Sequence, residues 1–600
     1  MRTAEQVLAI IHDRGNRGLP LEDVYRQLYN PALYLAAYGK ISRNRGAMTR
    51  GVTDETVDGM SEEKIARIIG LLREEKYRWT PVRRVYIEKK GSTKKRPLGL
   101  PTWSDKLLQE VIRMVLAAYY EPQFSDRSHG FRPARGCGTA ISEIYHTWRG
   151  TAWFIEGDIK GCFDNIDHAV LLSILAENIH DKRFLRLVSE LLKAGYVEDW
   201  RYNKTLSGTP QGGIVSPLLA NIYLDRLDQY VTGTLIPRHT RGITRKANPN
   251  YDRTRWIRRR LEAQGHHEEA ALLRKELGGM PSVDTSDPGY RRLRYVRYAD
   301  DFLLGFAGTR EEAEVIKASI QAFLRETLQL DLSGEKTLIT HARTEKARFL
   351  GYEISIAAAD ARRTNGQRTI NGLVTLGVPE DIIRQKCSRY MKAGKPIHRM
   401  EVTNDDVYSI IALFQAEYRG LVNYYRAAHN LSRLRILKWT MEQALTKTLA
   451  RKLKVSSKEV YRRFHASIEH ENGKTYKGLR AIVTRPGERP LVATWGGITL
   501  ARKMTNHLPD IPYQVWSARS EVLERLLAKE CEICTSTVQV NVHHIRKLAD
   551  LRKHGKTPAR WVTIMAARQR TTLVLCHSCH SALHAGRLDH WPAGESVRAV

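Results

Sequence analysis

The sequence predicts an α+β protein built from several domains. Its 600 residues are too many for a single hydrophobic core, and an apolar content of 42% is high enough to form real ones. Segments with helical and with strand-like periodicity alternate over residues 1–360, while the pattern over 375–480 is helical and basic. Two CxxC pairs near the C-terminal end favour a small metal-stapled domain over disulfides.

The charge balance indicates the class of partner. Lys and Arg number 97 against 65 Asp and Glu, which gives a formal charge of +32. Such an excess needs a polyanion, most simply nucleic acid, because self-repulsion otherwise opposes the compact state. The chain has no run of about 18 apolar residues and no signal-peptide stretch at its start. We therefore expect a soluble, intracellular protein that binds nucleic acid and has no membrane partner.

The first elements are expected before residue 120. Residues 1–75 carry apolar positions at helical spacing and are predicted to be helical. Residues 82–102 alternate as a strand, a heavily basic turn and a second strand. A helix follows over 104–120, and Ser104 is its predicted N-cap.

Strand and helix signals continue to residue 360. The segment 151–168 begins as a buried strand and ends in a turn that starts a helix, and 208–231 is a glycine-rich loop followed by a long helix. Residues 293–306 predict a hairpin of two apolar strands around an acidic turn. A helix over 309–328 and a short strand over 349–354 complete this part.

Two further segments mark boundaries. Residues 238–260 carry nine Lys or Arg and one acid, with Tyr251 and Trp256 among them. Arginines interleaved with aromatic rings suit phosphate contacts and base stacking, although a charged helical surface gives the same pattern. The PGERP segment at 486–490 is predicted to be a linker.

Three acids at predicted strand ends are candidates for metal chemistry. Asp158 follows a strand, and Asp300 and Asp301 lie in a hairpin turn. Carboxylates from such ends can converge on two Mg²⁺ ions that clamp the attacking and leaving oxygens of a phosphoryl transfer. An Asp-Asp pair in a hairpin can also be simple turn chemistry, so the acids need support from other motifs.

Seven segments in chain order resemble the polymerase blocks of the reverse transcriptase in group II intron-encoded proteins. The likeness extends over roughly 50–590. The segments are RPLGLPT (96–102), FSDRSHGFRPARG (124–136), GDIKGCFDNIDH (157–168), GTPQGGIVSPLLANIYLDRLD (208–228), YADD (298–301), LSGEKTLITH (332–341) and FLGY (349–352). The resemblance implies a right-hand polymerase with fingers and palm, followed by a helical thumb.

The resemblance also implies roles in the polymerase site. Asp158, Asp300 and Asp301 would hold two Mg²⁺ ions, and the backbone of Ile159 would complete one metal shell. Phe163 would be the aromatic gate beneath the sugar, where a ring against C2′ leaves no room for a 2′-hydroxyl. A phenylalanine that simply belongs to the core is the alternative for this position.

Further positions match nucleotide-binding residues of the family. Gln211 would lie beside the incoming nucleotide, where the neighbouring glycines allow close backbone approach. Lys89 and Arg96 would grip the triphosphate, although three nearby lysines compete for the role of Lys89. Lys336 would contact primer or nucleotide phosphates, or else be a solvated helix cation.

Residues 375–480 resemble the thumb and maturase (X) domain of the same family, most closely over YRGLVNYYRAAHN (418–430). An apolar stripe from Tyr418 to Tyr425 is expected to face the core. A basic surface without RNA contacts is the alternative for this region, and the family carries an RNA-contacting insertion where this chain has 238–260. The residues expected to meet RNA phosphates are Arg255, Arg258, Arg259, Arg260, Arg433, Arg435, Lys438, Lys447, Arg451, Lys452 and Lys454.

The C-terminal part combines cysteines with histidines. The two CxxC pairs stand 41 residues apart, wide for a simple zinc ribbon, so the gap can hold a fold stapled by one structural Zn²⁺. The predicted zinc ligands are Cys531, Cys534, Cys576 and Cys579. His580 and His584 stand at i and i+4 and share a helix face, whereas the adjacent His543 and His544 at a strand end point opposite ways.

This pattern resembles the HNH (ββα-metal) endonuclease found at the end of many group II intron proteins. The family implies His544 as general base for the water that attacks the scissile phosphate. It implies His543, His580 and His584 as ligands of one divalent ion. The middle Asn of the HNH motif has no clear counterpart, since Asn541 comes too early. A structural zinc finger that binds target DNA is the alternative.

The domains implied by the resemblance follow the chain. They are an N-terminal helical extension (1–75), reverse transcriptase fingers and palm (76–360, with a basic insertion at about 235–290), a thumb/maturase X domain (375–480), a linker and DNA-binding region (485–525) and a zinc-stabilised HNH endonuclease (526–590).

The implied function is that of a multifunctional group II intron-encoded protein. It would copy RNA into DNA, assist splicing of its intron RNA, and nick target DNA for target-primed reverse transcription during intron mobility. The expected partners are dNTPs, intron RNA and target DNA with exon sequences, in a bacterial cytoplasm at the nucleoid; a homodimer is left open. The alternatives are a reverse transcriptase of a CRISPR, retron or diversity-generating system, and a splicing-only maturase.

Overall fold

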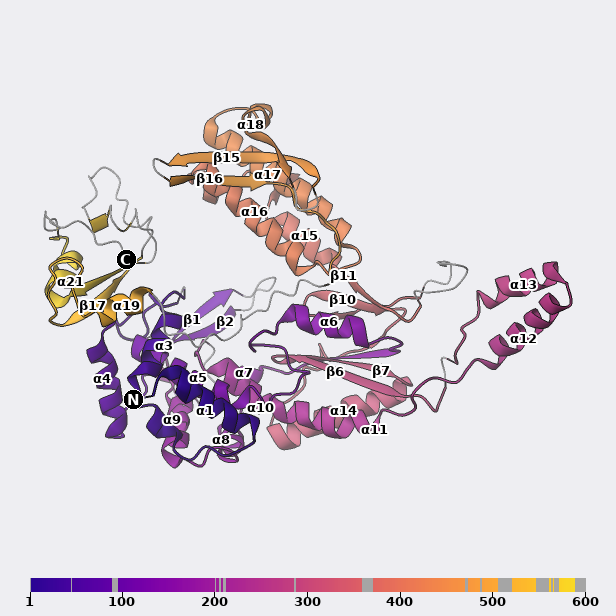
Figure 1. The fold of residues 1–600 in the computed structure, drawn as a ribbon, viewed down its shortest axis with the longest axis horizontal. Coiled ribbons are helices and arrows are strands. Elements are labelled where there is room, and N and C mark those ends of the chain that lie inside the picture. Colours follow the sequence, from indigo (N-terminus) through magenta and orange to yellow (C-terminus); the bar gives the residue numbers. More distant parts are fainter. Residues whose placement is uncertain are drawn as a thin grey trace.

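The computed structural model gives a mixed α/β architecture of several domains (Figure 1). It describes residues 2–44, 46–88, 95–199, 201–203, 205, 207–208, 212–284, 287–358, 371–469, 473–485, 488–504, 521–545, 561–562, 565 and 571–588. Among these residues, every helix is too short or too polar to cross a membrane.

Helices dominate the N-terminal region, which confirms the prediction for residues 1–75. The helices are α1 (Ala4–Asn16), α2 (Val24–Gln27), α3 (Pro31–Ile41), α4 (Glu62–Arg73) and α5 (Trp103–Tyr120). The predicted N-cap of α5 is wrong, because the Thr102 side chain accepts the hydrogen bond from the Asp105 amide. Ser104 lies inside the helix instead and donates its hydroxyl to Glu55.

A four-stranded sheet of order β2-β1-β4-β5 adjoins these helices. Its strands are β1 (Val82–Glu88), β2 (Lys95–Leu100), β4 (Tyr196–Glu198) and β5 (Arg201–Asn203). The antiparallel pairing of β1 with β2 confirms the two predicted strands, while most of the predicted basic turn (89–94) lies outside the described residues. Strand β1 also pairs in parallel with β4. The helices that follow in the chain are α6 (Cys137–Thr147), α7 (Cys162–Asn165), α8 (His168–Ala176), α9 (Lys182–Lys193), α10 (Ser216–Tyr230) and α11 (Ile236–Arg238).

The central sheet is antiparallel with order β6-β7-β3-β8. Its strands are β3 (Trp153–Asp158), β6 (Arg292–Tyr298), β7 (Asp301–Ala307) and β8 (Ile339–His341). Both faces are buried: Leu304 and Ile155 belong to the core shared with α14 (Arg310–Leu328), and Leu303 and Phe154 to the core shared with α6. Successive side chains of a strand point to opposite faces of the sheet. Because helices cover both faces here, both sets of side chains are buried, which explains why these strands are apolar throughout.

The predicted strand over 349–354 is two strands. In a second sheet of order β11-β10-β9, β9 (Ala347–Phe349) turns directly into β10 (Tyr352–Ile356), and β11 (Val374–Gly377) completes it. Leu350 and Gly351 between them both have positive φ, +47° and +72°. Two left-handed residues in a two-residue loop are typical of a tight β-hairpin. The sequence FLGYEI reads as one continuous apolar strand, so this hairpin was not predicted.

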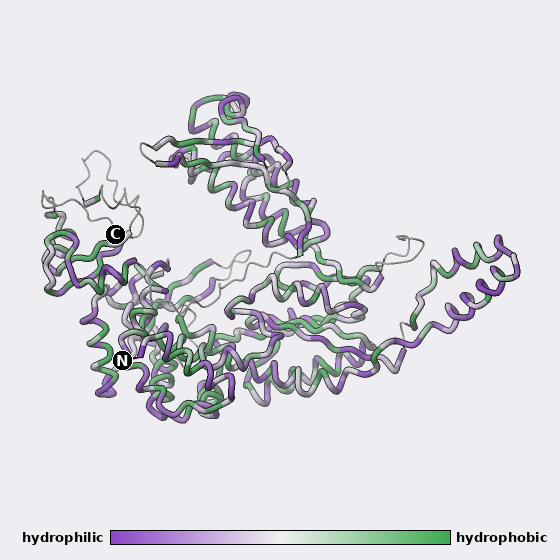
Figure 2. Tube along the Cα trace, in the orientation of Figure 1, coloured by the Kyte–Doolittle hydropathy of each residue, from purple (hydrophilic) through white to green (hydrophobic). Residues whose placement is uncertain are grey.

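The basic segment between α11 and β6 forms a helical hairpin that projects from the molecule. Its helices are α12 (Pro249–Ala263) and α13 (His267–Leu277). In Figure 2 this projection is coloured mostly as hydrophilic, and α12 has no buried residue. We call α12 and α13 the projecting hairpin.

Residues 380–464 form a helical bundle with the expected buried stripe, since Tyr418, Val422 and Tyr425 are buried. Its helices and short strands are α15 (Glu380–Ser388), β12 (Met391–Lys392), β13 (Lys395–Pro396), α16 (Val407–Tyr424), α17 (Arg435–Leu453) and α18 (Ser457–Phe464). The prediction of helix up to residue 480 is wrong beyond α18.

A three-stranded antiparallel sheet follows α18. Its strands are β14 (His465–Glu469), β15 (Thr475–Arg485) and β16 (Glu488–Trp495). The paired residues Leu479 and Trp495 are buried, whereas Ile482 and Val492 are exposed, so one face packs on α16. The prediction of a linker at 486–490 is also wrong, because Arg485 pairs with Glu488 where β15 and β16 meet. Pro and Gly are common in linkers and in hairpin turns alike, so the composition does not distinguish them.

The described residues between 521 and 588 form a small C-terminal domain. Its elements are α19 (Glu521–Leu527), β17 (Val540–His544), β18 (Thr572–Cys576) and α21 (His577–His584). Strands β17 and β18 pair antiparallel, and α19 packs beside α3 of the N-terminal region, as Figure 1 shows. The C-terminal domain therefore packs against the N-terminal region, although the two are far apart in sequence. Asp58 and His544, which are hydrogen-bonded, are 486 residues apart.

A buried ion pair links the central sheet to α10. Arg297 of β6 and Asp228 of α10 both have fully buried side chains, with Nη2 and Oδ2 2.5 Å apart. The same guanidinium donates to the Asn221 amide oxygen, the Ser128 hydroxyl and the Ala299 carbonyl. The ion pair therefore fixes the turn after β6 against α10 and the segment before α6.

We expect Arg297→Met to lower the free energy of unfolding by about 3–5 kcal/mol, because it leaves Asp228 buried without a partner. Urea denaturation followed by tryptophan fluorescence measures this change. Arg310→Met is the matched control, because Arg310 pairs with Glu314 on the surface with side chains 61% and 56% exposed. The control should cost at most about 1 kcal/mol, and an equally small loss for Arg297→Met would contradict the prediction.

Candidate active sites

Three carboxylates meet at one end of the central sheet. Asp158 is the last residue of β3 and stands directly opposite Asp301, the first residue of β7. Asp300 lies in the tight turn before it, and Ala299 in that turn has a left-handed φ of +55°. The pairing register thus brings together acids that are 142 and 143 residues apart in sequence.

The negative charges of the three carboxylates repel one another, which disfavours their ionised forms. Burial raises the pKa of Asp301 to about 7, and the charges of Asp300 and Asp158 add to this rise. Burial also raises the pKa of Asp300. Three acids held this close are stable in their ionised form only with positive charge beside them. The site is therefore suited to divalent cations with oxygen ligands, such as Mg²⁺.

Lys336 supplies part of that charge. Its ammonium nitrogen lies 2.9 and 2.8 Å from the two carboxylate oxygens of Asp158. Its side chain remains 58% exposed, so the ammonium group can exchange partners. The predicted contact with phosphates stays a prediction, and the structure adds that Lys336 faces the acids.

The walls of this site come from several elements. Ile159 is buried and its backbone forms a bridge with Leu332. Phe163 lies on α7, partly buried against the main core. A side chain at Gly208 would collide with the carbonyl oxygen of Phe163, and Gly208 has a φ of +88°. Glycine is needed there because the loop passes close to α7 with left-handed geometry.

The same loop also approaches β2, since an added side chain at Gly212 would collide with the carbonyl oxygen of Gly99. Arg96 is an exposed residue of β2 whose charge acts on Asp300. Lys89 and Gln211 lie outside the described residues, so their predicted roles stay predictions.

The four cysteines form one cluster in the C-terminal domain. The sulfur atoms of Cys531, Cys534, Cys576 and Cys579 all lie within 4.8 Å of one another, and none is in a disulfide. Four thiolates at this spacing suit one tetrahedral Zn²⁺ ion. Cys531 and Cys576 are buried in the small core of the domain, so such an ion would staple it internally.

A second cluster unites three histidines with an unexpected acid. His543 Nδ1 lies 3.1 Å from His580 Nε2, which lies 3.1 Å from His584 Nε2. Asp58, from the segment before α4, lies 3.2 Å from His543 and 2.8 Å from His584. Burial disfavours its ionised form, but hydrogen bonds from the histidines hold the pKa of Asp58 well below its usual range. Sequence analysis missed Asp58, which no motif spacing marks.

His544 points away from this cluster, as expected for adjacent strand residues. Its Nε2 lies 2.7 Å from the hydroxyl of Tyr38 on α3. The ring is only 6% exposed, and burial lowers the pKa of His544 to about 4. The ring is therefore neutral near pH 7 but out of contact with solvent. The role of His544 as a general base stays a prediction. It would require the His544 ring to leave Tyr38 and become accessible to water.

The basic residues predicted to contact RNA lie on two surfaces. On the projecting hairpin, Arg255, Arg259 and Arg260 are exposed, whereas Arg258 is half-buried and pairs with Glu262. The Arg260 guanidinium also lies 5.6 Å from the ring centre of Trp256, which is 60% exposed. Cations beside an exposed indole suit phosphate and base contacts.

The second basic surface is on the helical bundle. Arg433, Arg435, Arg451 and Lys454 are exposed, and Lys438 is half-buried. Two lysines have contacts within the protein: Lys447 donates to the Pro396 carbonyl and Lys452 to the Thr403 carbonyl. The exposed side chains Ile436 and Trp439 are next in sequence to Arg435 and Lys438 on α17.

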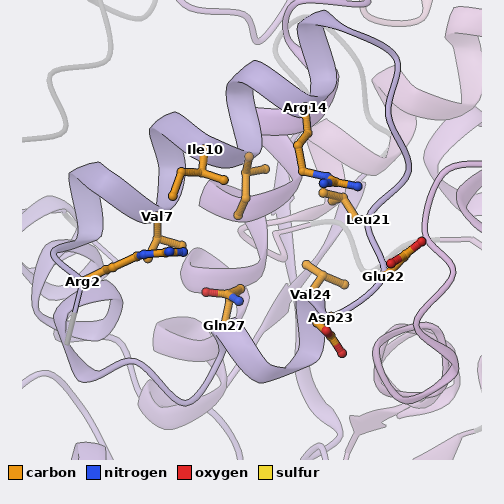
Figure 3. Close-up of a pocket in the computed structure, with 10 residues that line it drawn as sticks. Arg2, Val7, Ile10, Arg14, Leu21, Glu22, Asp23, Val24 and Gln27 are labelled. Atoms are coloured by element: carbon orange, nitrogen blue, oxygen red, sulfur yellow. The ribbon is translucent and has the colours of Figure 1, made fainter.

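A pocket in the N-terminal region is separate from all of these groups. Figure 3 shows that its lining residues come from α1, from α2 and from the segments that lead into these helices. Val7 and Ile10 line it together with Arg14, Glu22 and Asp23. None of its lining residues belongs to the carboxylate, cysteine or histidine clusters.

Three protein-family models match the chain in succession. Residues 87–354 match the model for reverse transcriptase (RNA-dependent DNA polymerase). Residues 380–486 match type II intron maturase, and residues 531–580 match AI2M/AI1M-like HNH endonuclease. The maturase match favours the intron-encoded alternative over the CRISPR, retron and diversity-generating systems.

Relatives match almost the whole chain. It is 39% identical over 581 residues to the group II intron-encoded protein LtrA of Lactococcus lactis subsp. cremoris, covering 93% of this chain and 94% of that protein. It is 34% identical over 577 residues to an uncharacterized 91 kDa protein in the cob intron of Schizosaccharomyces pombe, covering 94% and 69%. The chain therefore belongs to the group II intron-encoded proteins and is a reverse transcriptase with maturase and HNH endonuclease domains.

Proposed function

We propose that this group II intron-encoded protein performs its tasks at separate places on the chain. Synthesis of cDNA is assigned to Asp158, Asp300 and Asp301, and nicking of target DNA to the histidines of the C-terminal domain. Binding of intron RNA is assigned to the projecting hairpin and the helical bundle. The observation that carries this proposal is that the three carboxylates of the central sheet, the histidine cluster and the basic residues stand on different elements and share no residue.

In this proposal the chain is a right hand. The helices of residues 1–75 extend the fingers, residues 76–360 form fingers and palm, and 375–480 form the thumb and maturase domain. The antiparallel central sheet, with its acids at one end, is the palm. The hairpin of β1 and β2 belongs to the fingers, and the helical bundle is the thumb. The C-terminal domain is a ββα-metal nuclease, since β17, β18 and α21 follow that order.

In the palm, two Mg²⁺ ions would supply Lewis-acid stabilisation of the attacking and leaving oxygens. Asp158 and Asp301 would hold these ions from facing strands, with Asp300 and the backbone of Ile159 adding oxygen ligands. Lys336 neutralises Asp158 in the free protein and is then available to bind a phosphate. The repulsion among the carboxylates supports this assignment, because bound cations would offset the repulsion.

The other groups of this site select and hold a dNTP. The Phe163 ring would exclude a 2′-hydroxyl, and Arg96 would bind the triphosphate from β2. Lys89 and Gln211 keep the roles that the family resemblance implies. The charge of Arg96 acting on Asp300 supports its position near the reacting phosphates.

In the C-terminal domain, Zn²⁺ would be structural and one divalent ion would serve the nuclease. The four cysteines hold the zinc, and His543, His580 and His584 hold the second ion. His544 would act as general base once its ring has left Tyr38. Target DNA with its exon sequences is therefore a partner of this domain, in a bacterial cytoplasm at the nucleoid.

We expect Asp300→Ala to reduce cDNA synthesis by at least about 100-fold, because a preorganised charge at the reacting phosphate is lost. Splicing assistance should persist, since the RNA surfaces lie on other elements. Primer extension and intron splicing, measured on one preparation, test this. Glu314→Gln, which alters an exposed carboxylate of α14, is the control. Loss of both activities in Asp300→Ala would contradict the separation of sites.

His580→Ala should abolish nicking of target DNA and spare primer extension, because it removes a metal ligand. His577→Ala is the matched control: His577 lies on the same helix, is exposed and stands outside the cluster. His544→Ala should also stop nicking while metal binding persists. Nicking assays on labelled duplex check all three variants, and unchanged cleavage by His544→Ala would remove it from its assigned role.

Cys531→Ser should lower the zinc content by one ion per chain and unfold the C-terminal domain, because small domains of this kind depend on their metal. Metal analysis together with hydrogen exchange in β17 and β18 measures both effects. Cys387→Ser, at a buried cysteine outside the cluster, should keep the full zinc content. Wild-type protection of β17 and β18 without zinc would argue against a structural ion.

A further inference from the structure

The nuclease histidines are met by an acid from the other end of the chain. Besides its contacts with His543 and His584, the Asp58 carboxylate lies 3.3 Å from His580 Nε2. One oxygen or nitrogen from each of these four residues lies within 4.8 Å of all the others. His543 is buried, Asp58 and His580 are half-buried and His584 is exposed, so the cluster lies in the seam between domains.

Backbone pairing holds Asp58 in this seam. The Gly59 amide donates to the Val542 carbonyl at 3.0 Å, and the Val542 amide donates to the Met60 carbonyl at 2.9 Å. The His544 amide donates to the Asp58 carboxylate at 2.7 Å. Gly59 has a φ of +72°, so a left-handed residue turns the chain where Asp58 enters the cluster. The segment 58–60 is thus a turn tied to β17 by an isolated antiparallel bridge between Met60 and Val542.

We propose that Asp58 is a fourth ligand of the divalent ion in the nuclease, and that it keeps the nuclease inactive until target DNA displaces it. This inference rests on the proposed function of His543, His580 and His584. Three nitrogen ligands and one carboxylate make a closed, four-coordinate set, whereas catalytic sites of this kind keep one position open for water or substrate. Asp58 occupies that open position.

The general base is masked by the same region. Tyr38 on α3 binds the His544 ring while Asp58 binds the His544 amide. Both contacts come from the N-terminal region, and both would have to break before water and a scissile phosphate reach the site. A DNA phosphate oxygen carries the same negative charge as the Asp58 carboxylate, so it is a chemically matched competitor for the position.

Binding of Co²⁺ to the full-length protein, with Zn²⁺ already in the cysteine site, tests the ligand. Four-coordinate Co²⁺ absorbs visible light far more strongly than the six-coordinate ion expected in an all-oxygen palm site. We expect Asp58→Ala to weaken Co²⁺ binding at least about tenfold and to reduce this absorption. Asp58→Asn, which keeps an acceptor for the His544 amide, guards against a folding defect. Asp54→Asn, in the same segment with an 89% exposed side chain, is the matched control.

Two further readouts make the outcome decisive. Co²⁺ should slow hydrogen exchange at Gly59 and Val542 in the wild type but not in Asp58→Asn. Nicking with saturating Mg²⁺ should be several-fold faster in Asp58→Asn than in the wild type. Unchanged Co²⁺ affinity in both Asp58 variants, or slower nicking, would overturn the proposal. If His580→Ala keeps the wild-type Co²⁺ spectrum, the proposed nuclease site itself fails, which is a separate result.

Discussion

The buried pair of Arg297 and Asp228 is the constraint on which the position of the acidic turn in the reverse transcriptase domain depends. An ion pair with no exposed surface survives only when hydrogen bonds satisfy every remaining polar atom, and here an amide, a hydroxyl and a carbonyl complete the set. Arg297 stands three residues before Asp300, so its position determines where the acidic turn lies. Asp228 stands on α10, directly after the glycine-rich loop. One interaction thus fixes the acidic turn against α10.

The carboxylate cluster of the central sheet and the histidine cluster of the C-terminal domain show opposite electrostatics. In the carboxylate cluster of the central sheet, acids meet acids, and burial with mutual repulsion raises the pKa of Asp301 to about 7. In the histidine cluster of the C-terminal domain, Asp58 meets histidines, and their hydrogen bonds lower its pKa. The first site therefore needs added cations before it is fully ionised. In the histidine cluster, one carboxylate is already hydrogen-bonded to histidines, so the four potential ligands contact one another without an added cation.

The three acids could be singled out from the sequence because their signal is local: Asp158 ends an apolar strand, and Asp300 and Asp301 lie in the turn of an apolar hairpin. The structure adds the register that places Asp158 opposite Asp301. The cysteine cluster was accessible for the same reason, through CxxC spacing. Asp58 was not, because the pairing of segment 58–60 with β17 depends on a contact across 486 residues. The sheet after α18 was missed because its strands alternate between a buried face and exposed apolar residues such as Ile482.

The small core of the C-terminal domain explains why the N-terminal region can control it. Its own cluster of buried residues is formed around Cys531, Leu573 and Leu575, which is too little to hold a domain without a metal staple. Val522, Leu526 and other apolar residues of the domain are instead buried in the core of the N-terminal helices. Detaching the whole domain would expose that apolar surface to water. Moving only the Asp58 side chain out of the cluster breaks its contacts with the three histidines and the hydrogen bond from the His544 amide. It leaves Met60 and α19 buried, so it is the smaller movement that opens the metal site.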